Sequence, residues 1–590
     1  MRFSVWAPRA ESTVTLVLEG TRHVMNPAQD GWWQTDQDAA PGASYSFVID
    51  DGEPRADPRA LALPEGPEGP SVVIDRSQLA IETVPWRGVQ LPGAVIYEMH
   101  VGTFTPEGTL DAAIGRLDHL SELGVDIVEV MPLATFPGRY GWGYDGVGLY
   151  AVHEPYGGPL AFRRFVDACH ARGLGVCLDV VYNHLGPSGN HLEEFGPYFT
   201  DRYGTPWGGA LNLDDAGSDE VRRFVIENAV MWLRDFYVDG LRLDAVHALF
   251  DDRAITLLEE LSAEVNAWSA RLGRPLWLIA ESDRNDPLTV TAREAGGLGL
   301  NAQWADDVHH ALHVLLTGET QGYYADFATP GALKKVLEGI FLHDGTYSTF
   351  RQRTHGRRVD RAKLPGSRFV VSLQTHDQVG NRAQGDRLST QVSTGRLACG
   401  AALLLTSAGT PMLFMGEEWG ASTPWQYFTD HTEPRIAAAV RRGRRDEFAE
   451  HGWDRSDVPD PQSTRTAERS HLDWEELRHD PHARLFWWYR DLIRLRRERG
   501  DLRDPRLDRV RVDHDPDRQT VLVQRGSYLV AVNLAPETRV VDVAPCDAEA
   551  AYKQDADLGL VLSWEHAATT LDGGLLTLPA ESASVLGPAR

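Results

Sequence analysis

Three carboxylates, each at the end of its own apolar run, have the residue types and spacing for nucleophilic and acid–base chemistry. They are Asp244 in GLRLDAVH, Glu281 in PLWLIAES and Asp377 in FVVSLQTHD. Apolar runs of this length, separated by helix-like segments, predict buried parallel strands, and an acid that follows a barrel strand is typical of a catalytic residue. Cleavage of a glycosidic bond needs one carboxylate to attack the sugar carbon and a second carboxyl to protonate the departing oxygen. The pattern therefore predicts a site that breaks glycosidic bonds.

The neighbours of these acids suggest a role for each of them. Arg242 and Asp244 are two residues apart on a strand, so they face the same way, and the guanidinium keeps Asp244 ionised as a nucleophile requires. Taken alone, this pair could equally be structural. Glu281 follows the apolar LWLIA, where partial desolvation raises its pKa and suits it to act as general acid and then base. For a retaining mechanism we expect the carboxyl groups of Asp244 and Glu281 to lie about 5 to 5.5 Å apart.

Several further residues are suited to holding sugar hydroxyls or a sugar ring. Asp179, Asn183 and His184 end the run LDVVYNH, and His376 directly precedes Asp377. Tyr144, in GRYGWGYDG, could stack beneath a sugar ring or belong to ordinary packing. Calcium needs six to eight oxygen ligands and no acidic loop of that kind is evident, so we predict neither a metal nor a cofactor.

The elements that must position these residues fall into three regions. The chain has 590 residues, which is too long for one hydrophobic core. Short alternating runs predict β-domains at both ends, and eight strand candidates alternating with helical periods predict a barrel between them. The predicted fold class is α/β, a (β/α)8 TIM barrel flanked by an N-terminal β-sandwich and a C-terminal antiparallel β-domain. The predicted limits are 1–88 for the sandwich, which would be immunoglobulin-like and carbohydrate-binding-module-like, 89–502 for the barrel with a small excursion at about 185–218, and 503–590 for the last domain.

Composition narrows the classes of partner and compartment. A formal charge of -27 disfavours nucleic acid, because an acidic surface repels polyanions. The first residues have no basic-then-apolar signal pattern, and no apolar run approaches the roughly 18 residues of a membrane span. The four scattered Cys residues indicate reduced thiols and hence a cytoplasmic protein without membrane association. Monomer and homodimer both stay open.

Four segments resemble the signature regions of the α-amylase clan of glycoside hydrolases. In order along the chain they are DVVYNH, GLRLDAVH, LIAES and QTHDQVGN. The resemblance implies that Asp244 is the nucleophile, Glu281 the acid/base and Asp377 the transition-state stabiliser. It also implies that His184, Arg242 and His376 surround the sugar at the cleavage point.

Longer segments narrow the resemblance within the clan. FSVWAP and IYEMHVGTFTPEGTL resemble the subgroup that holds branching enzymes, isoamylases and maltooligosyltrehalose trehalohydrolases, while AESDRNDP, QWADDVHH, THDQVGNR and MGEEWGASTPWQYFTDH resemble the trehalohydrolases. Val308 departs from the aromatic expected at its position. The likeness implies hydrolysis of the α-1,4 bond adjoining the terminal trehalose of maltooligosyltrehalose, with release of trehalose and a maltooligosaccharide. Composition and spacing alone reach only a retaining α-glycan hydrolase or transferase.

Two alternatives accompany this interpretation. A glycogen branching or debranching enzyme would carry the same three acids, and an inactive glycan-binding homologue would usually have lost one of them. Selection of the bond beside trehalose must come from contacts to the leaving disaccharide. The candidates for these contacts are His247, Asp286, Asp306, Asp307, His309, His310, Gln378 and Asn381, each of which could otherwise be a solvated loop residue.

Overall fold

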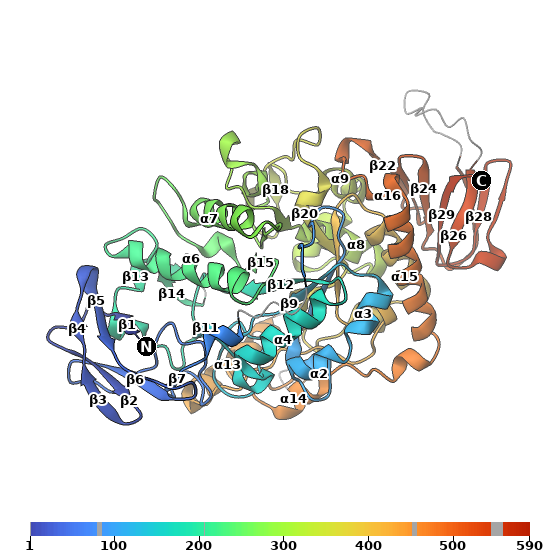
Figure 1. Cartoon of the computed structure of the whole chain (residues 1–590). Coiled ribbons are helices and arrows are strands. Elements are labelled where there is room, and N and C mark those ends of the chain that lie inside the picture. The colour runs from blue at the N-terminus through green and yellow to red at the C-terminus, as the bar shows by residue number, and fades with distance from the viewer. Residues whose placement is uncertain (1, 80–84, 206, 451–456, 544–557, 590) are drawn as a thin grey trace.

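A closed barrel of parallel strands forms the centre of the molecule. The computed structural model describes residues 2–79, 85–205, 207–450, 457–543 and 558–589. Neighbouring barrel strands follow one another in chain order, and the last pairs with the first, so the sheet has no free edge (Figure 1). The strands are β8 (Ile96–Met99), β9 (Ile127–Val130), β12 (Gly175–Val180), β15 (Gly240–Leu243), β16 (Trp277–Ala280), β17 (Ala302–Trp304), β20 (Phe369–Ser372) and β21 (Thr410–Phe414). The eight predicted strands are thus confirmed.

Helices lie between most of these strands in the chain, and further helices follow the last strand. The larger ones are α3 (Leu117–Leu123), α4 (Gly158–His170), α6 (Ser218–Arg234), α7 (Leu257–Leu272), α8 (Asp306–Thr317), α9 (Ala332–Gly339), α12 (Thr394–Leu405), α13 (Pro434–Glu450) and α15 (His482–Glu498). Local sequence sets their limits. At the start of α7, Thr256 and Glu259 form a capping box, and Gly273 takes the left-handed conformation that ends the helix.

The lower part of the barrel interior is filled with apolar side chains. Gly240 lies against the indole of Trp277, and a Cβ atom at Gly240 would come 1.9 Å from that ring, so only glycine fits there. Ile127, Cys177 and Ile279 belong to the same buried cluster. Since alternate residues of a strand share a face, Asp179, Arg242 and Glu281 point inward above this cluster. The polar site therefore rests on a packed apolar floor.

Antiparallel sheets lie at the two ends of the molecule, on either side of the barrel (Figure 1). The N-terminal sheets are β1 (Arg2–Trp6), β5 (Trp32–Asp36) and β4 (Asn26–Pro27), and β3 (Thr21–Val24), β2 (Val14–Leu18), β6 (Ser44–Ile49) and β7 (Ser71–Val72). The C-terminal sheets are β22 (Val510–Asp515), β23 (Thr520–Arg525), β24 (Tyr528–Asn533), β29 (Ser582–Pro588) and β26 (Leu558–Ser563), and β25 (Arg539–Asp542), β28 (Leu575–Leu578) and β27 (Thr570–Asp572). The predicted fold class is confirmed, while the domain limits stay predictions.

Two hairpins lie beyond the ends of barrel strands. The first, β13 (Phe199–Thr205) with β14 (Gly208–Leu211), falls in the predicted excursion at 185–218. It brings the exposed ring of Trp207 parallel to His184, with ring centroids 5.2 Å apart. The second, β18 (Thr346–Ser348) with β19 (Arg353–His355), lies between β17 and β20 and was not foreseen in the sequence. Its three-residue strands are too short to show an alternating pattern.

The cysteines and the hydropathy of the helices can be compared with what the sequence predicted of them. Cys169, Cys177 and Cys399 are free and buried, as expected, while Cys546 lies outside the described residues. Within the described ranges, no helix has both the length and the hydropathy needed to cross a bilayer.

Candidate active site

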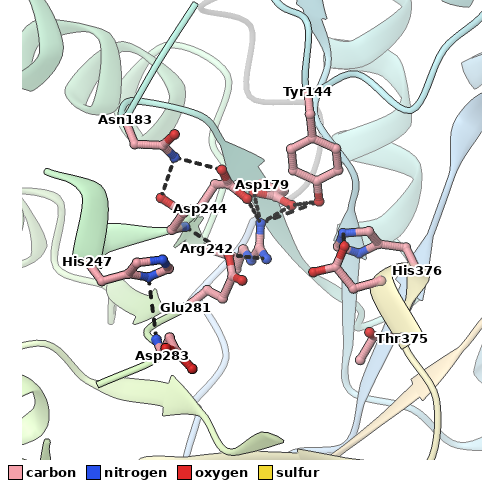
Figure 2. A network of polar contacts seen from close by, with 12 residues as sticks. Tyr144, Asp179, Asn183, Arg242, Asp244, His247, Glu281, Asp283, Thr375 and His376 are labelled. Atoms are coloured by element: carbon pink, nitrogen blue, oxygen red, sulfur yellow. Dashed lines mark hydrogen bonds and ion pairs between the residues drawn. The ribbon is translucent and has the colours of Figure 1, made fainter. Parts of the chain in front are cut away.

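The guanidinium of Arg242 joins three carboxylates at the upper end of the barrel. Its Nη1 donates to both oxygens of Asp179, at 2.9 and 2.8 Å, and to Oδ1 of Asp244 at 2.9 Å. Its Nη2 donates to Oε2 of Glu281 at 2.8 Å, as Figure 2 shows. The side chain of Arg242 is fully buried, and its guanidinium lies 4.3 Å from the ring centroid of Trp304. A buried cation of this kind fixes the relative positions of the acids from β12, β15 and β16.

Both carboxylate oxygens of Asp244 accept hydrogen bonds. Oδ1 accepts from Arg242, and Oδ2 accepts from Nδ2 of Asn183 at 2.7 Å. Asn183, which we expected to bind a sugar hydroxyl, therefore holds the carboxylate in place. Burial raises the pKa of Asp244, while the Arg242 charge and the Asn183 hydrogen bond oppose that shift. Two donors on an otherwise buried carboxylate favour its ionised form.

The two oxygens of Glu281 have different surroundings. Oε2 accepts from Arg242 and from the backbone N–H of Ala245, each at 2.8 Å. Ala245 has φ 39° and ψ 51°, a left-handed conformation that side chains other than glycine rarely adopt, and this conformation aims its N–H at the carboxylate. Burial raises the pKa of Glu281, and Asp244 raises it further against the opposing effect of Arg242. This is the direction expected for a general acid.

Asp377 is the most exposed of the three acids, with 38% of its side chain accessible. Its Oδ1 lies 3.4 Å from Nε2 of His376 and accepts from Nδ2 of Asn381 at 3.2 Å. The first barrel strand also contributes a residue to this part of the site. The buried Glu98 of β8 pairs with Nδ1 of His376 at 2.5 Å. Glu98 was not predicted from the sequence, although an acid inside the apolar run AVIYEM is the same kind of signal as the three predicted acids.

Comparison with known proteins gives the family of this chain. Residues 64–199 match the model of the alpha amylase catalytic domain. A malto-oligosyltrehalose trehalohydrolase of Arthrobacter ramosus is 56% identical, over 91% of this chain and 93% of its own length. One from Rhizobium sp. (strain M-11) is 50% identical, over 99% and 97%. The chain belongs to the malto-oligosyltrehalose trehalohydrolase family. It is therefore a glycosidase of the α-amylase type.

A solved structure agrees with this assignment. The chain resembles a putative alpha amylase from Salmonella typhimurium with a TM-score of 0.89 and 37% identity, over 99% of this chain and 97% of that one. The likeness extends over the barrel and both flanking regions, so the whole fold is shared.

Asp179 and Tyr144, which we expected to contact the substrate, have polar groups that are hydrogen-bonded within the protein. Asp179 is buried; its oxygens accept from Arg242, and Oδ2 also accepts from the Tyr144 hydroxyl at 2.6 Å. The ring of Tyr144 stacks on His376 with centroids 5.0 Å apart. His184 lies beside them, its Nε2 3.0 Å from the carbonyl oxygen of Tyr144. The structure gives Asp179 the task of holding Arg242 and Tyr144, and contact of either residue with substrate stays a prediction.

The predicted rim residues separate into buried and accessible groups. Asp307 is buried, and its Oδ2 accepts from Asn285 and from the backbone N–H groups of Leu342 and His343, so it supports a loop. His309 is buried among aromatic rings. The partly or fully accessible members are His247, Asp286, Asp306, His310, Gln378 and Asn381. Only this second group retains surface for a ligand.

Among these partly accessible residues, Asp306 is influenced by the charges of two of the predicted catalytic acids, Glu281 and Asp377. Burial, reinforced by the charges of Glu281 and Asp377, raises the pKa of Asp306 to about 8. At neutral pH the Asp306 carboxyl is therefore largely protonated, so it can donate as well as accept a hydrogen bond.

The rim beyond Glu281 contains residues that were not predicted from the sequence. Arg351, in the loop between the two strands of the second hairpin, pairs with Asp283. Phe350 is 55% exposed and lies 5.8 Å from the ring of Tyr323, which stacks in turn on His310. Their positions depend on how the segment after β17 folds back over the barrel, and no local pattern shows that. Among the described residues, no group of three or more His, Cys, Asp or Glu side chains is arranged to hold a metal ion.

Proposed function

We propose that this protein is a retaining glycoside hydrolase that cleaves the α-1,4 bond adjoining the terminal trehalose of maltooligosyltrehalose, releasing trehalose and a maltooligosaccharide. The observation that carries the chemistry is the contact of one buried guanidinium with both Asp244 and Glu281. The names of the relatives supply the substrate. Such an activity would serve the synthesis of trehalose.

The hydrogen bonds of Asp244 and Glu281 support a proposed task for each of these acids. Asp244 attacks the anomeric carbon of the glucose unit that precedes the trehalose, and the bond from that carbon to the leaving oxygen breaks. Oε2 of Glu281 has two N–H donors, so the acidic proton belongs on Oε1, which passes it to the leaving oxygen. Glu281 then takes a proton from water, and the resulting hydroxide displaces Asp244 from the glycosyl ester. Both carboxyl groups return to their starting states.

The carboxylate of Asp377 would stabilise the positive charge that develops on the sugar, and His376 lies beside this carboxylate. Asp377 keeps more of its side chain exposed than the other two acids, which fits contact with substrate hydroxyls. Hydrogen bonds to hydroxyls that strengthen in the transition state accelerate this chemistry.

The surroundings of Glu281 support a subsite for the leaving disaccharide. An acid that protonates the leaving oxygen must stand on the side where the disaccharide departs, and the chain continues from Glu281 to Asp283 on that side. There Arg351 pairs with Asp283, and the exposed ring of Phe350 belongs to the residue directly before Arg351 in the chain. An ion pair beside flat apolar rings offers both hydrogen bonds for hydroxyls and a surface for the C–H face of a sugar.

The experiment that tests the proposal compares maltooligosyltrehalose with a maltooligosaccharide of equal length. We expect kcat/KM to favour the first by at least about tenfold, which corresponds to roughly 1.4 kcal/mol of transition-state binding, with free trehalose as the product. The Asp244→Ala variant is the control for contaminating activity. Equal rates on the two substrates, or new α-1,6 branches in the products, would leave the branching or debranching alternative.

A further inference from the structure

Glu98 and His376 form a buried pair below the catalytic acids. They are 278 residues apart in the chain, and each has 1% of its side chain exposed. Oε2 of Glu98 accepts the backbone N–H of His376 at 2.9 Å, and Oε1 lies 2.5 Å from Nδ1 of the ring. One carboxylate thus holds both the main chain and the side chain of the residue that precedes Asp377.

The second ring nitrogen of His376 also faces a carboxylate. Nε2 lies 3.4 Å from Oδ1 of Asp377. A neutral imidazole carries one hydrogen, so one of its nitrogens would point a lone pair at a carboxylate oxygen. The imidazolium form has a hydrogen for each side. The stacked ring of Tyr144 adds a favourable face for a cation.

The other groups around His376 determine whether this charge can persist. The titratable or charged side chains that act on the ring are Glu98, His100, Glu129, Asp179, Arg242 and Asp377. Burial by itself lowers the pKa of His376, and Arg242 acts in the same direction. The carboxylates of Glu98 and Asp377 outweigh both and raise the pKa to about 9. Removal of the Glu98 charge therefore takes away the larger of the two carboxylate contributions and lowers the pKa of His376.

We propose that Glu98 is a positioning residue that keeps both ring nitrogens of His376 protonated, so that its Nε2–H is directed at Asp377 and at a hydroxyl of the bound sugar. Glu98 does not touch the substrate; it acts through His376. The inference rests on the proposed glycoside hydrolysis at this site for its kinetic consequence. Its structural half, a positively charged His376, can be tested without any substrate.

The Glu98→Gln variant removes the negative charge at position 98 while keeping nearly the same side-chain shape. Glutamine can still accept the backbone N–H of His376 through its carbonyl oxygen, but its amide presents N–H groups to Nδ1. The ring then stays in place as a neutral imidazole. Glu98→Asp keeps the charge and shortens the side chain. Glu129→Gln is the matched control, because Glu129 pairs in register with Glu98 on the next strand and, among the described residues, makes no hydrogen bond to His376.

The first measurement is a histidine titration by NMR in protein labelled with ¹³C-histidine, with His376→Asn to assign the signal. We expect a midpoint near pH 9 in the wild type, a midpoint at least about 1 pH unit lower in Glu98→Gln, and a smaller change than this in Glu129→Gln. Glu98→Asp should stay close to the wild type. A wild-type midpoint near or below 6.5 overturns the proposal, even if Glu98→Gln does not fold.

The second measurement is the pH dependence of kcat/KM on a maltooligosyl fluoride. Fluoride leaves without protonation, so the ionisation of Glu281 does not limit the rate at high pH. We expect activity to fall above about pH 9 in the wild type and at least about 1 pH unit earlier in Glu98→Gln. An unchanged profile in Glu98→Gln, or an equal shift in Glu129→Gln, overturns the proposal. If the NMR result holds but maltooligosyltrehalose is not cleaved, the substrate proposal fails and the role of Glu98 in charging His376 stands.

Discussion

The backbone N–H of Ala245 donates to Oε2 of Glu281 at 2.8 Å, so the residue that follows the proposed nucleophile holds the proposed acid. Ala245 reaches this position with φ 39°. The backbone at the end of β15 thus sets the geometry of the acid on β16.

Substitution of Ala245 tests this relationship. Proline has no N–H and cannot adopt a positive φ, whereas glycine keeps the N–H and accepts the backbone conformation. We expect Ala245→Pro to lower kcat/KM by about 100-fold, in line with the loss of a hydrogen bond to a charged group, and Ala245→Gly to remain within a few-fold of wild type. Steady-state kinetics, with circular dichroism to confirm folding, makes the comparison. Similar losses in both variants would show that the N–H is not the important feature.

A covalent intermediate is expected on Asp244. Asp244→Ala should lower turnover by several orders of magnitude while the fold survives, because the residue lies at the functional face of the barrel. In Glu281→Gln, a maltooligosyl fluoride should form the glycosyl ester faster than water removes it. Mass spectrometry of the digested variant should then find the sugar on the peptide that contains Asp244. A label on another acid would reassign the nucleophile.

The role of Glu281 predicts a dependence on the leaving group. A sugar is a poor leaving group and needs the proton that Glu281 supplies, whereas fluoride does not. Glu281→Gln should therefore lose far more kcat/KM on maltooligosyltrehalose than on a maltooligosyl fluoride. Equal losses on the two substrates would assign Glu281 another role.

His100 should make the fold sensitive to acid. Burial lowers the pKa of His100 to about 3, and its ring fits the neutral form, since Nε2 lies 2.9 Å from the Gly141 carbonyl and Nδ1 lies 2.9 Å from the Thr103 hydroxyl. Between its unfolded pKa of about 6.5 and its folded value, only the unfolded chain binds this proton. The contribution of His100 is thus complete above about pH 6.5, and as pH falls from there toward about 3 the free energy of unfolding decreases by about 1.4 kcal/mol per unit.

Urea unfolding at a series of pH values checks this sign. His100→Gln should give a shallower loss of stability between about pH 6.5 and 4 than the wild type, whatever its stability at neutral pH. His566→Gln, at an exposed position, is the control and should keep the wild-type slope. Parallel curves for His100→Gln and the wild type would contradict the assignment.

The fold and the three acids could be predicted because their signal is local. The barrel strands lie in largely apolar runs; Asp244 and Glu281 directly follow two of them, and Asp377 follows the end of β20 after four further residues. The tasks of Asp179 and Asn183 could not be predicted, because they depend on the register of neighbouring strands. This register pairs Asp179 with Arg242 across β12 and β15. Glu98 acts on a residue 278 positions away, and only the closure of the barrel brings the two together.

The close fit of Gly240 against Trp277 should couple the evolution of these two positions. Any side chain at 240 would need the space of the indole, and loss of the indole alone would open a void under Arg242. Substitution of either residue alone would lower the stability of the protein. We therefore expect a substitution at one position to be retained only when the other position is substituted soon afterwards. Among homologous chains, we therefore expect glycine and tryptophan at these positions to be inherited together or replaced together.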